Sequence, residues 1–123
     1  MTFVVVDDDE GARSAVARLL RCMGHAVHVF ESAEAFEAHA VPADCLILDV
    51  RLPGITGPEL RDRLRSRQDM TPVVFITGDT DTRELVQASG TPTLAKPFDD
   101  VALMAAVAAA VSLAEGEGER HAG

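Results

Sequence analysis

The sequence lacks several features that mark specialised classes of protein. No apolar run is long enough to cross a membrane, and no basic segment precedes an apolar stretch at the N-terminus. Cations are scarce, with a formal net charge of −9, which argues against direct nucleic-acid binding. The two cysteines, Cys22 and Cys45, lie in apolar runs without metal-ligand spacing, so we predict two buried free thiols. Together these absences predict a cytoplasmic protein without a membrane contact.

The residues that are present predict one compact unit. A chain of 123 residues with 47% hydrophobic residues is long enough and apolar enough to bury a core. Short apolar segments alternate with helical patterns along the chain. Strands are predicted at Phe3–Val6, Ala26–Phe30, Cys45–Leu48, Pro72–Ile76 and Thr91–Ala95.

Five helical patterns lie between and after these strands. Ser32 and Asp99 are the predicted N-caps of the second and last helices. The fourth helix is predicted around Thr82–Ala88 and the last at about Val101–Ala114. This alternation predicts an α/β fold, a flavodoxin-like doubly wound five-stranded parallel sheet of order 2-1-3-4-5 with helices on both faces. We take 1–114 as one domain and 115–123 as a flexible polar tail.

Chemically active side chains follow several of the predicted strands. Asp49 ends the apolar run that begins at Cys45, and Asp7 and Asp8 follow the first strand. Thr77 and Lys96, the only lysine, follow the fourth and fifth strands. The carboxyl ends of parallel strands share one edge, which is where such sheets bind ligands. We therefore expect these side chains to converge.

Converging carboxylates need either a proton or a cation among them. Oxygen ligands without nearby His or Cys favour Mg²⁺. A carboxylate also attacks phosphorus to form an acyl phosphate, a transfer that needs mainly positioning and positive charge. Asp7 or Asp8 as a simple helix cap is the plainer interpretation, but three consecutive acids exceed what a cap requires. Asp9 and Glu10 are predicted to lie in the first helical turn without a site role.

Four pieces of sequence, all at predicted strand ends, carry a family resemblance: VVVDDDEGAR, CLILDVRLPGITG, PVVFITGD and LAKPF. In this order and spacing, the chain up to about Leu113 resembles the receiver domain of two-component response regulators. Its first half resembles receivers of nitrogen-fixation-type regulators. The fourth-helix region is more similar to receivers of hybrid histidine kinases.

The resemblance implies a role for each matching position. Asp49 would be the phosphoacceptor, taking its phosphoryl group from a sensor histidine kinase or a histidine phosphotransfer protein. Asp8 and Asp49 would bind Mg²⁺ through their side chains, Arg51 through its backbone carbonyl and Asp7 through a water molecule. Such a module would catalyse only its own phosphorylation and dephosphorylation and would not be an enzyme acting on other substrates.

The remaining implied roles concern the phosphoryl group and its lifetime. Thr77 would donate a hydrogen bond to the phosphoryl group and Lys96 would pair with it, with a cis peptide bond before Pro97. Arg51 and Asp79 each lie two residues past a site residue, a position that tunes phosphoryl lifetime in this family.

Two departures from the family concern output. Thr93 stands where the family commonly has Tyr or Phe as a switch, and the segment 77–96 is short, which predicts a truncated fourth helix. The last helix is apolar nearly all round, and Met104 and Val111 lie off the stripe expected to face the sheet. We expect a homodimer or an effector to bind there.

Other functions stay open at this stage. A degenerate receiver would act only as a protein-binding module. An aspartyl-phosphate phosphohydrolase would carry an acid where Arg51 stands, and a nucleotide or flavin binder would carry a phosphate-binding loop where DDDE stands. The sequence also leaves open the identity of the kinase, the signal and the output, and whether the chain stands alone or is part of a longer regulator.

Overall fold

The structure is a computed structural model that describes residues 1–39, 41–78 and 90–122, with side chains up to Glu115. A five-stranded parallel sheet has the order β2-β1-β3-β4-β5, as predicted. Its strands are β1 (Thr2–Val6), β2 (Ala26–Phe30), β3 (Cys45–Asp49), β4 (Val73–Thr77) and β5 (Thr93–Ala95).

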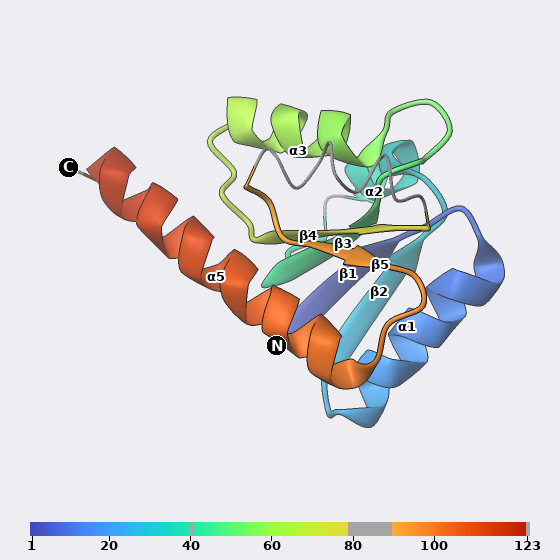
Figure 1. Cartoon of the computed structure of the whole chain (residues 1–123). Helices are drawn as coiled ribbons and strands as arrows, with labels where there is room; N and C mark the ends of the chain where they lie inside the picture. Colours follow the sequence, from blue (N-terminus) through green and yellow to red (C-terminus); the bar gives the residue numbers. More distant parts are fainter. Residues whose placement is uncertain (40, 79–89, 123) are drawn as a thin grey trace.

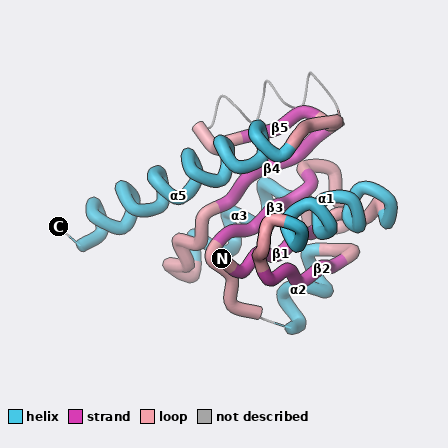
Figure 2. The backbone as a smooth tube through the Cα atoms, turned by 90° about the horizontal axis from the view of Figure 1, so that it is seen from below, coloured by secondary structure: helices cyan, strands magenta, loops and turns pink. Residues whose placement is uncertain are grey.

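Helices cover both faces of the sheet (Figures 1 and 2). One face is packed by α2 (Ala33–His39) and α3 (Gly57–Ser66), and the other by α1 (Glu10–Cys22) and α5 (Asp100–Ala122). The predicted fourth helix, Thr82–Ala88, lies outside the described residues. Among the described residues, no helix combines the length and apolarity needed to cross a membrane.

The central strands place alternate side chains on opposite faces, so each face has its own core. In β1, Val4 and Val6 pack toward α2 and α3, while Phe3 and Val5 pack toward α1 and α5. All five residues of β3 and all five of β4 are buried. Strands buried on both faces are typical of a parallel sheet wrapped by helices, and they fix the edge at which the polar residues emerge.

The predicted caps form as expected. The Ser32 hydroxyl accepts a hydrogen bond from the Ala35 amide at 3.0 Å, and Asp99 accepts one from Ala102 at 2.8 Å. Asp9 is an additional cap, because it precedes α1 and accepts from the Ala12 amide at 3.3 Å. The placement of Asp9 inside the first turn was therefore wrong by one position.

Two further predictions are wrong. Cys45 is buried as expected, but Cys22 is exposed, because it lies on the outer side of the last turn of α1. The last helix was predicted to end at about Ala114, whereas α5 continues to Ala122. The intervening glycines weaken a helix by only about 1 kcal/mol each relative to alanine, so they do not by themselves end one. The flexibility of 115–123 stays a prediction.

Candidate functional site

The parallel register brings the predicted site residues to one edge of the sheet. Asp7 follows β1, Asp49 is the last residue of β3, and Thr77 is the last residue of β4. Lys96 follows β5, and its amide donates to the Thr77 carbonyl at 2.8 Å, which joins the two strand ends. Four segments that are distant in the sequence therefore meet at the carboxyl ends of neighbouring strands.

Three carboxylates gather at this edge. One oxygen from each of Asp7, Asp8 and Asp49 lies within 4.8 Å of the others. Asp7 is fully buried and Asp49 is 7% exposed, whereas Asp8 is open to solvent. Two buried carboxylates beside a third acid are unfavourable unless positive charge compensates them. The convergence predicted from the sequence is therefore present, with its electrostatic consequence.

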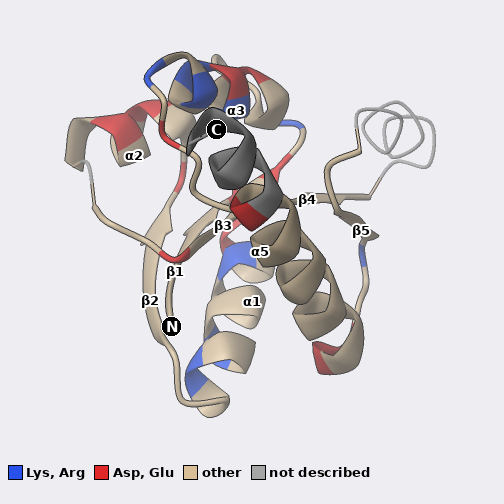
Figure 3. Ribbon diagram, turned by 90° about the vertical axis from the view of Figure 1, so that its left-hand side faces the viewer, with Lys and Arg blue, Asp and Glu red and all other residues tan. Residues whose placement is uncertain are grey.

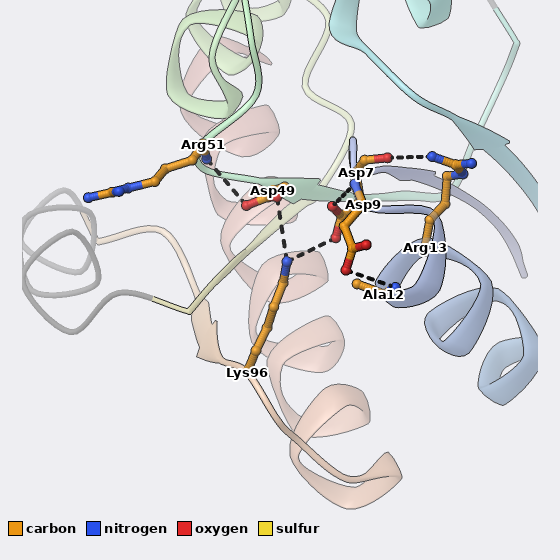
Figure 4. A network of polar contacts seen from close by, with 7 residues as sticks. All are labelled: Asp7, Asp9, Ala12, Arg13, Asp49, Arg51 and Lys96. Carbon is orange, nitrogen blue, oxygen red and sulfur yellow. Dashed lines mark hydrogen bonds and ion pairs between the residues drawn. The ribbon is translucent and has the colours of Figure 1, made fainter.

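Lys96 supplies part of that positive charge (Figure 4). Its Nζ lies 3.0 Å from Asp7 Oδ2 and 3.5 Å from Asp49 Oδ2. Burial by itself lowers the pKa of Lys96, but the hydrogen bond to Asp7 and the negative charge of Asp49 outweigh it and raise the pKa. Lys96 is therefore held as a cation between the two buried acids.

The second oxygens of the buried acids contact backbone amides. Asp7 Oδ1 accepts a hydrogen bond from the Asp9 amide at 3.0 Å, and Asp49 Oδ1 accepts one from the Arg51 amide at 3.2 Å. The Arg51 side chain points away from the Asp49 carboxylate (Figure 4). Arg51 therefore contacts the Asp49 carboxylate through its backbone amide, while Lys96 contacts the other carboxylate oxygen.

Asp49 remains under-compensated despite these contacts. Burial, followed by the negative charge of Asp7, raises the pKa of Asp49 to about 6, against an opposing effect of Lys96. The cluster has three carboxylates and one ammonium, a formal excess of two negative charges. A divalent cation matches that excess, and an all-oxygen donor set suits Mg²⁺. The residues present therefore fit a magnesium ion.

The other predicted residues lie around this centre. Thr77 is buried at the end of β4, and the peptide bond between Lys96 and Pro97 is cis, as the resemblance implied. Thr93 begins β5, half-buried, and its hydroxyl donates to the Thr91 carbonyl at 3.0 Å. Asp79, predicted to tune phosphoryl lifetime, lies outside the described residues.

Three features of the site had not been predicted. The guanidinium of Arg13 donates to the Asp7 carbonyl oxygen at 2.8 Å. A side chain on Gly57 would place its Cβ 2.5 Å from the Asp49 carbonyl oxygen, so α3 approaches β3 this closely only with glycine there. An open, mainly apolar cavity of about 240 Å³ adjoins Lys96, lined also by Leu19 and Phe98. For these features the sequence offered one signal, the segment DDDEGAR, which contains Arg13. That segment does not indicate what Arg13 contacts.

Comparisons with known proteins agree with this geometry. The sequence model of the family described as "Response regulator receiver domain" matches residues 3–108. The transcriptional regulatory protein FixJ of Azorhizobium caulinodans is 40% identical over 122 residues, which is 95% of this chain and 58% of FixJ. The response regulator protein TodT of Pseudomonas putida is 32% identical over 89% of this chain and 51% of TodT. The chain thus spans little more than half the length of these relatives.

Solved structures give the same result. Full-length FixJ from B. japonicum superposes with a TM-score of 0.80 at 33% identity, over 98% of this chain and 62% of FixJ. The response regulator StyR superposes with a TM-score of 0.79 at 36% identity, over 98% of this chain and 63% of StyR. The predicted resemblance to nitrogen-fixation-type receivers is confirmed. The chain belongs to the response regulator receiver domain family, the phosphoacceptor signalling modules of two-component systems, which use Mg²⁺ at an acidic aspartate cluster.

Proposed function

We propose that Asp49 is the phosphoacceptor of this receiver and that a phosphohistidine on a sensor kinase or phosphotransfer protein is its donor. An Asp49 carboxylate oxygen attacks phosphorus, an O–P bond forms and the N–P bond of the donor breaks. The released imidazole nitrogen takes up a proton. The single observation that carries the proposal is the buried Asp49 carboxylate at the strand edge, with two further acids and the only lysine around it.

The neighbouring residues have distinct parts in this proposal. Asp8 and Asp49 hold Mg²⁺ through their carboxylates, Asp7 holds it through a water molecule and Arg51 through its backbone carbonyl. When bound, the ion supplies positive charge to the phosphoryl oxygens. Lys96, already a cation 3.5 Å from Asp49, is available to pair with the phosphoryl group. The hydroxyl of Thr77 donates to another of its oxygens.

The decisive experiment is phosphorylation with a small phosphodonor. The full chain is incubated with acetyl phosphate and Mg²⁺, and its intact mass is measured. We expect one added phosphoryl group in the wild type and none with chelator or in Asp49→Asn. Asp62→Asn, an exposed acid on α3, is the matched control and should be modified normally. Equal modification of Asp49→Asn and wild type would overturn the assignment.

The mass measurement and an assay of phosphate release from monoesters together separate the two alternatives. A degenerate receiver that only binds proteins would gain no phosphoryl group under any condition. An aspartyl-phosphate phosphohydrolase would release phosphate from external monoesters in many turnovers. Arg51 stands where such an enzyme would carry an acid to protonate its leaving group, which disfavours turnover. We expect the chain to dephosphorylate only itself.

We further propose that the donor protein docks beside Lys96. The cavity of about 240 Å³ lies between α1 and the segment after β5, and Ala12, Ala15, Leu19 and Phe98 contribute apolar walls. An apolar surface next to the phosphoacceptor suits a partner that must bring its phosphohistidine to Asp49. Ala15→Glu should slow transfer from the kinase while leaving modification by acetyl phosphate unchanged. Equal slowing with both donors would contradict docking at this cavity.

The output contact is proposed to involve α5 and a second copy of the chain. Figure 3 shows α5 without charged residues over most of its described length. Val101 is 73% exposed and Leu113 is 48% exposed, whereas Met104 and Val111 are half-buried against the core. Apolar surface of this kind favours self-association.

Sedimentation tests this contact before and after phosphorylation. Val101→Glu with Leu113→Glu should abolish association and leave Asp49 phosphorylation intact. Met104→Glu with Val111→Glu should also abolish it, but with some loss of stability because both side chains pack on the core. A wild type that stays monomeric in both states would contradict the proposal.

A further inference from the structure

Arg13 extends from α1 back to the turn that carries the acidic residues (Figure 4). Its Nη1 donates to the Asp7 carbonyl oxygen at 2.8 Å, and its amide donates to the Asp9 carbonyl at 2.9 Å. The side chain is half-buried, unlike Arg18 on the same helix, which is exposed. Arg13 is therefore bonded at both ends to the segment between β1 and α1.

The Asp7 carbonyl belongs to the peptide group that joins Asp7 to Asp8. Because that group is planar, fixing its oxygen also fixes the direction in which the Asp8 backbone leaves it. Asp7 has other supports, since its carboxylate is bound by Lys96 at 3.0 Å and by the Asp9 amide at 3.0 Å. Asp8 differs: its side chain is exposed, and within the described parts of the chain no hydrogen bond or ion pair fixes its carboxylate. Its position therefore depends on the backbone of the turn.

We propose that Arg13 is a positioning residue that holds the peptide before Asp8 and thereby orients the Asp8 carboxylate for Mg²⁺. The inference rests on the proposed function, in which Asp8 binds the ion directly. Arg13 does not touch the ion or the phosphoryl group. It acts through the Asp7 carbonyl, in the way that outer residues orient metal ligands in other sites.

A second effect of Arg13 has the opposite sign, which makes the proposal testable. A guanidinium near the acids repels a divalent cation. If Arg13 acted only through its charge, removing it would therefore tighten Mg²⁺ binding. Removing it when it positions Asp8 would weaken Mg²⁺ binding, by roughly 10-fold or more on the scale of such outer-residue variants. The direction of the change therefore distinguishes positioning from simple charge.

The experiment measures the Mg²⁺ dissociation constant of the full chain by titration calorimetry. Arg13→Met removes the charge and the donors, while Arg13→Lys keeps the charge and one donor group. We expect roughly 10-fold weaker binding for Arg13→Met and a smaller loss for Arg13→Lys. Arg18→Met removes the same charge from an exposed position of α1, and should bind as tightly as wild type or slightly more tightly.

Two more measurements complete the test. Amide hydrogen exchange of Asp8 and Asp9 without Mg²⁺ should be faster in Arg13→Met than in Arg18→Met. Urea unfolding reports any loss of global stability, and if Arg13→Met does not fold, Arg13→Lys decides. Wild-type affinity in a folded Arg13 variant, or tighter binding, would overturn the inference while leaving the proposed function intact. A wild type that binds no Mg²⁺ would overturn both.

Discussion

Two carboxylates in this molecule are each paired with cations, and their surroundings drive their pKa values in opposite directions. Glu37 of α2 accepts hydrogen bonds from Arg63 of α3 and from Arg67, the residue that caps the C-terminal end of α3, the shortest at 2.7 Å. Asp49 of β3 has Lys96 at 3.5 Å, and that lysine also contacts Asp7. Burial raises the pKa of Glu37, but the two arginines outweigh it and lower the pKa below its ordinary value.

The difference shows how carboxylates paired with cations make a structural tie in one place and an acidic cluster suited to a cation in another. Around Glu37 the cations outnumber the acid, and the network joins α2 to α3 on the acid- and base-rich side seen in Figure 3. Around Asp49 the acids outnumber the cation, and burial raises the pKa to about 6. A compensated carboxylate stabilises the native state, whereas an under-compensated one destabilises it until a cation binds.

The largest expected effect is a pH dependence that separates the two carboxylates. Asp49 has a higher pKa folded than unfolded, about 6 against 3.8, so the native state holds the proton more tightly. Its contribution is therefore favourable at low pH and is lost as pH rises from about 4 to above 6. The shift corresponds to a decrease in the free energy of unfolding on the order of 3 kcal/mol across this pH range. In urea unfolding without Mg²⁺ across this range, the free energy of unfolding of Asp49→Asn should increase relative to that of wild type as pH rises.

Glu37 supplies the opposite control in the same measurement. Because its folded pKa is lowered, its stabilisation is present above its unfolded value of about 4.5 and is lost as pH falls below that value. Glu37→Gln should therefore differ from wild type at pH 7 and converge with it in acid. If Asp49→Asn and wild type kept a constant difference from pH 4 to pH 7, the under-compensation of Asp49 would be wrong.

The next effect is stabilisation by Mg²⁺. A ligand that binds only the native state adds roughly 2.7 kcal/mol to the free energy of unfolding at 100 times its dissociation constant. Thermal unfolding of the wild type should shift upward with Mg²⁺ and hardly at all in Asp8→Asn. A melting temperature indifferent to Mg²⁺ in the wild type, yet raised by Asp8→Asn, would indicate repulsion among the acids without a metal site.

A smaller effect is expected at the structural tie. Glu37→Gln removes the charge but keeps a similar shape, and the arginines are about half exposed, at 49% and 55% of their side-chain area. Exposed pairs contribute about 0.2–1 kcal/mol each, so we expect a loss near 1 kcal/mol in urea unfolding at pH 7. Mg²⁺ affinity and Asp49 phosphorylation should not change. A change in either would mean that the two regions are coupled.

The sequence was sufficient to predict the fold and the centre of the site, for a physical reason. Runs such as Cys45–Leu48 are apolar without alternation, which marks strands buried on both faces, and parallel topology then brings their ends together. The convergence of Asp7, Asp49 and Lys96 follows from this topology alone. The edge chemistry is therefore encoded by position along the strands.

What the sequence did not reveal depends on contacts that leave no periodic pattern. The bond from Arg13 goes to a backbone carbonyl, and any residue type presents one, so no partner residue marks it. The exposure of Cys22 depends on the rotation of the last turn of α1, where the apolar stripe is already ending. The exclusion of a side chain at Gly57 appears only once α3 is placed against the Asp49 carbonyl.

The smallest effect concerns Arg51, which adjoins Asp49 in sequence without acting as Arg63 and Arg67 do at Glu37. Its side chain points away from the Asp49 carboxylate, so its charge is not a direct partner of that group (Figure 4). Arg51→Ala keeps the backbone amide and carbonyl, and should leave the pH dependence and Mg²⁺ affinity unchanged.

The proposed role of the side chain is to restrict access of water to the acyl phosphate. Exposed ion pairs contribute about 0.2–1 kcal/mol, and an effect of that size would shorten the phosphoryl lifetime by no more than about five-fold. Phosphate release after removal of the donor measures that lifetime, with Asp62→Asn as the control, and an equal or longer lifetime in Arg51→Ala would contradict shielding.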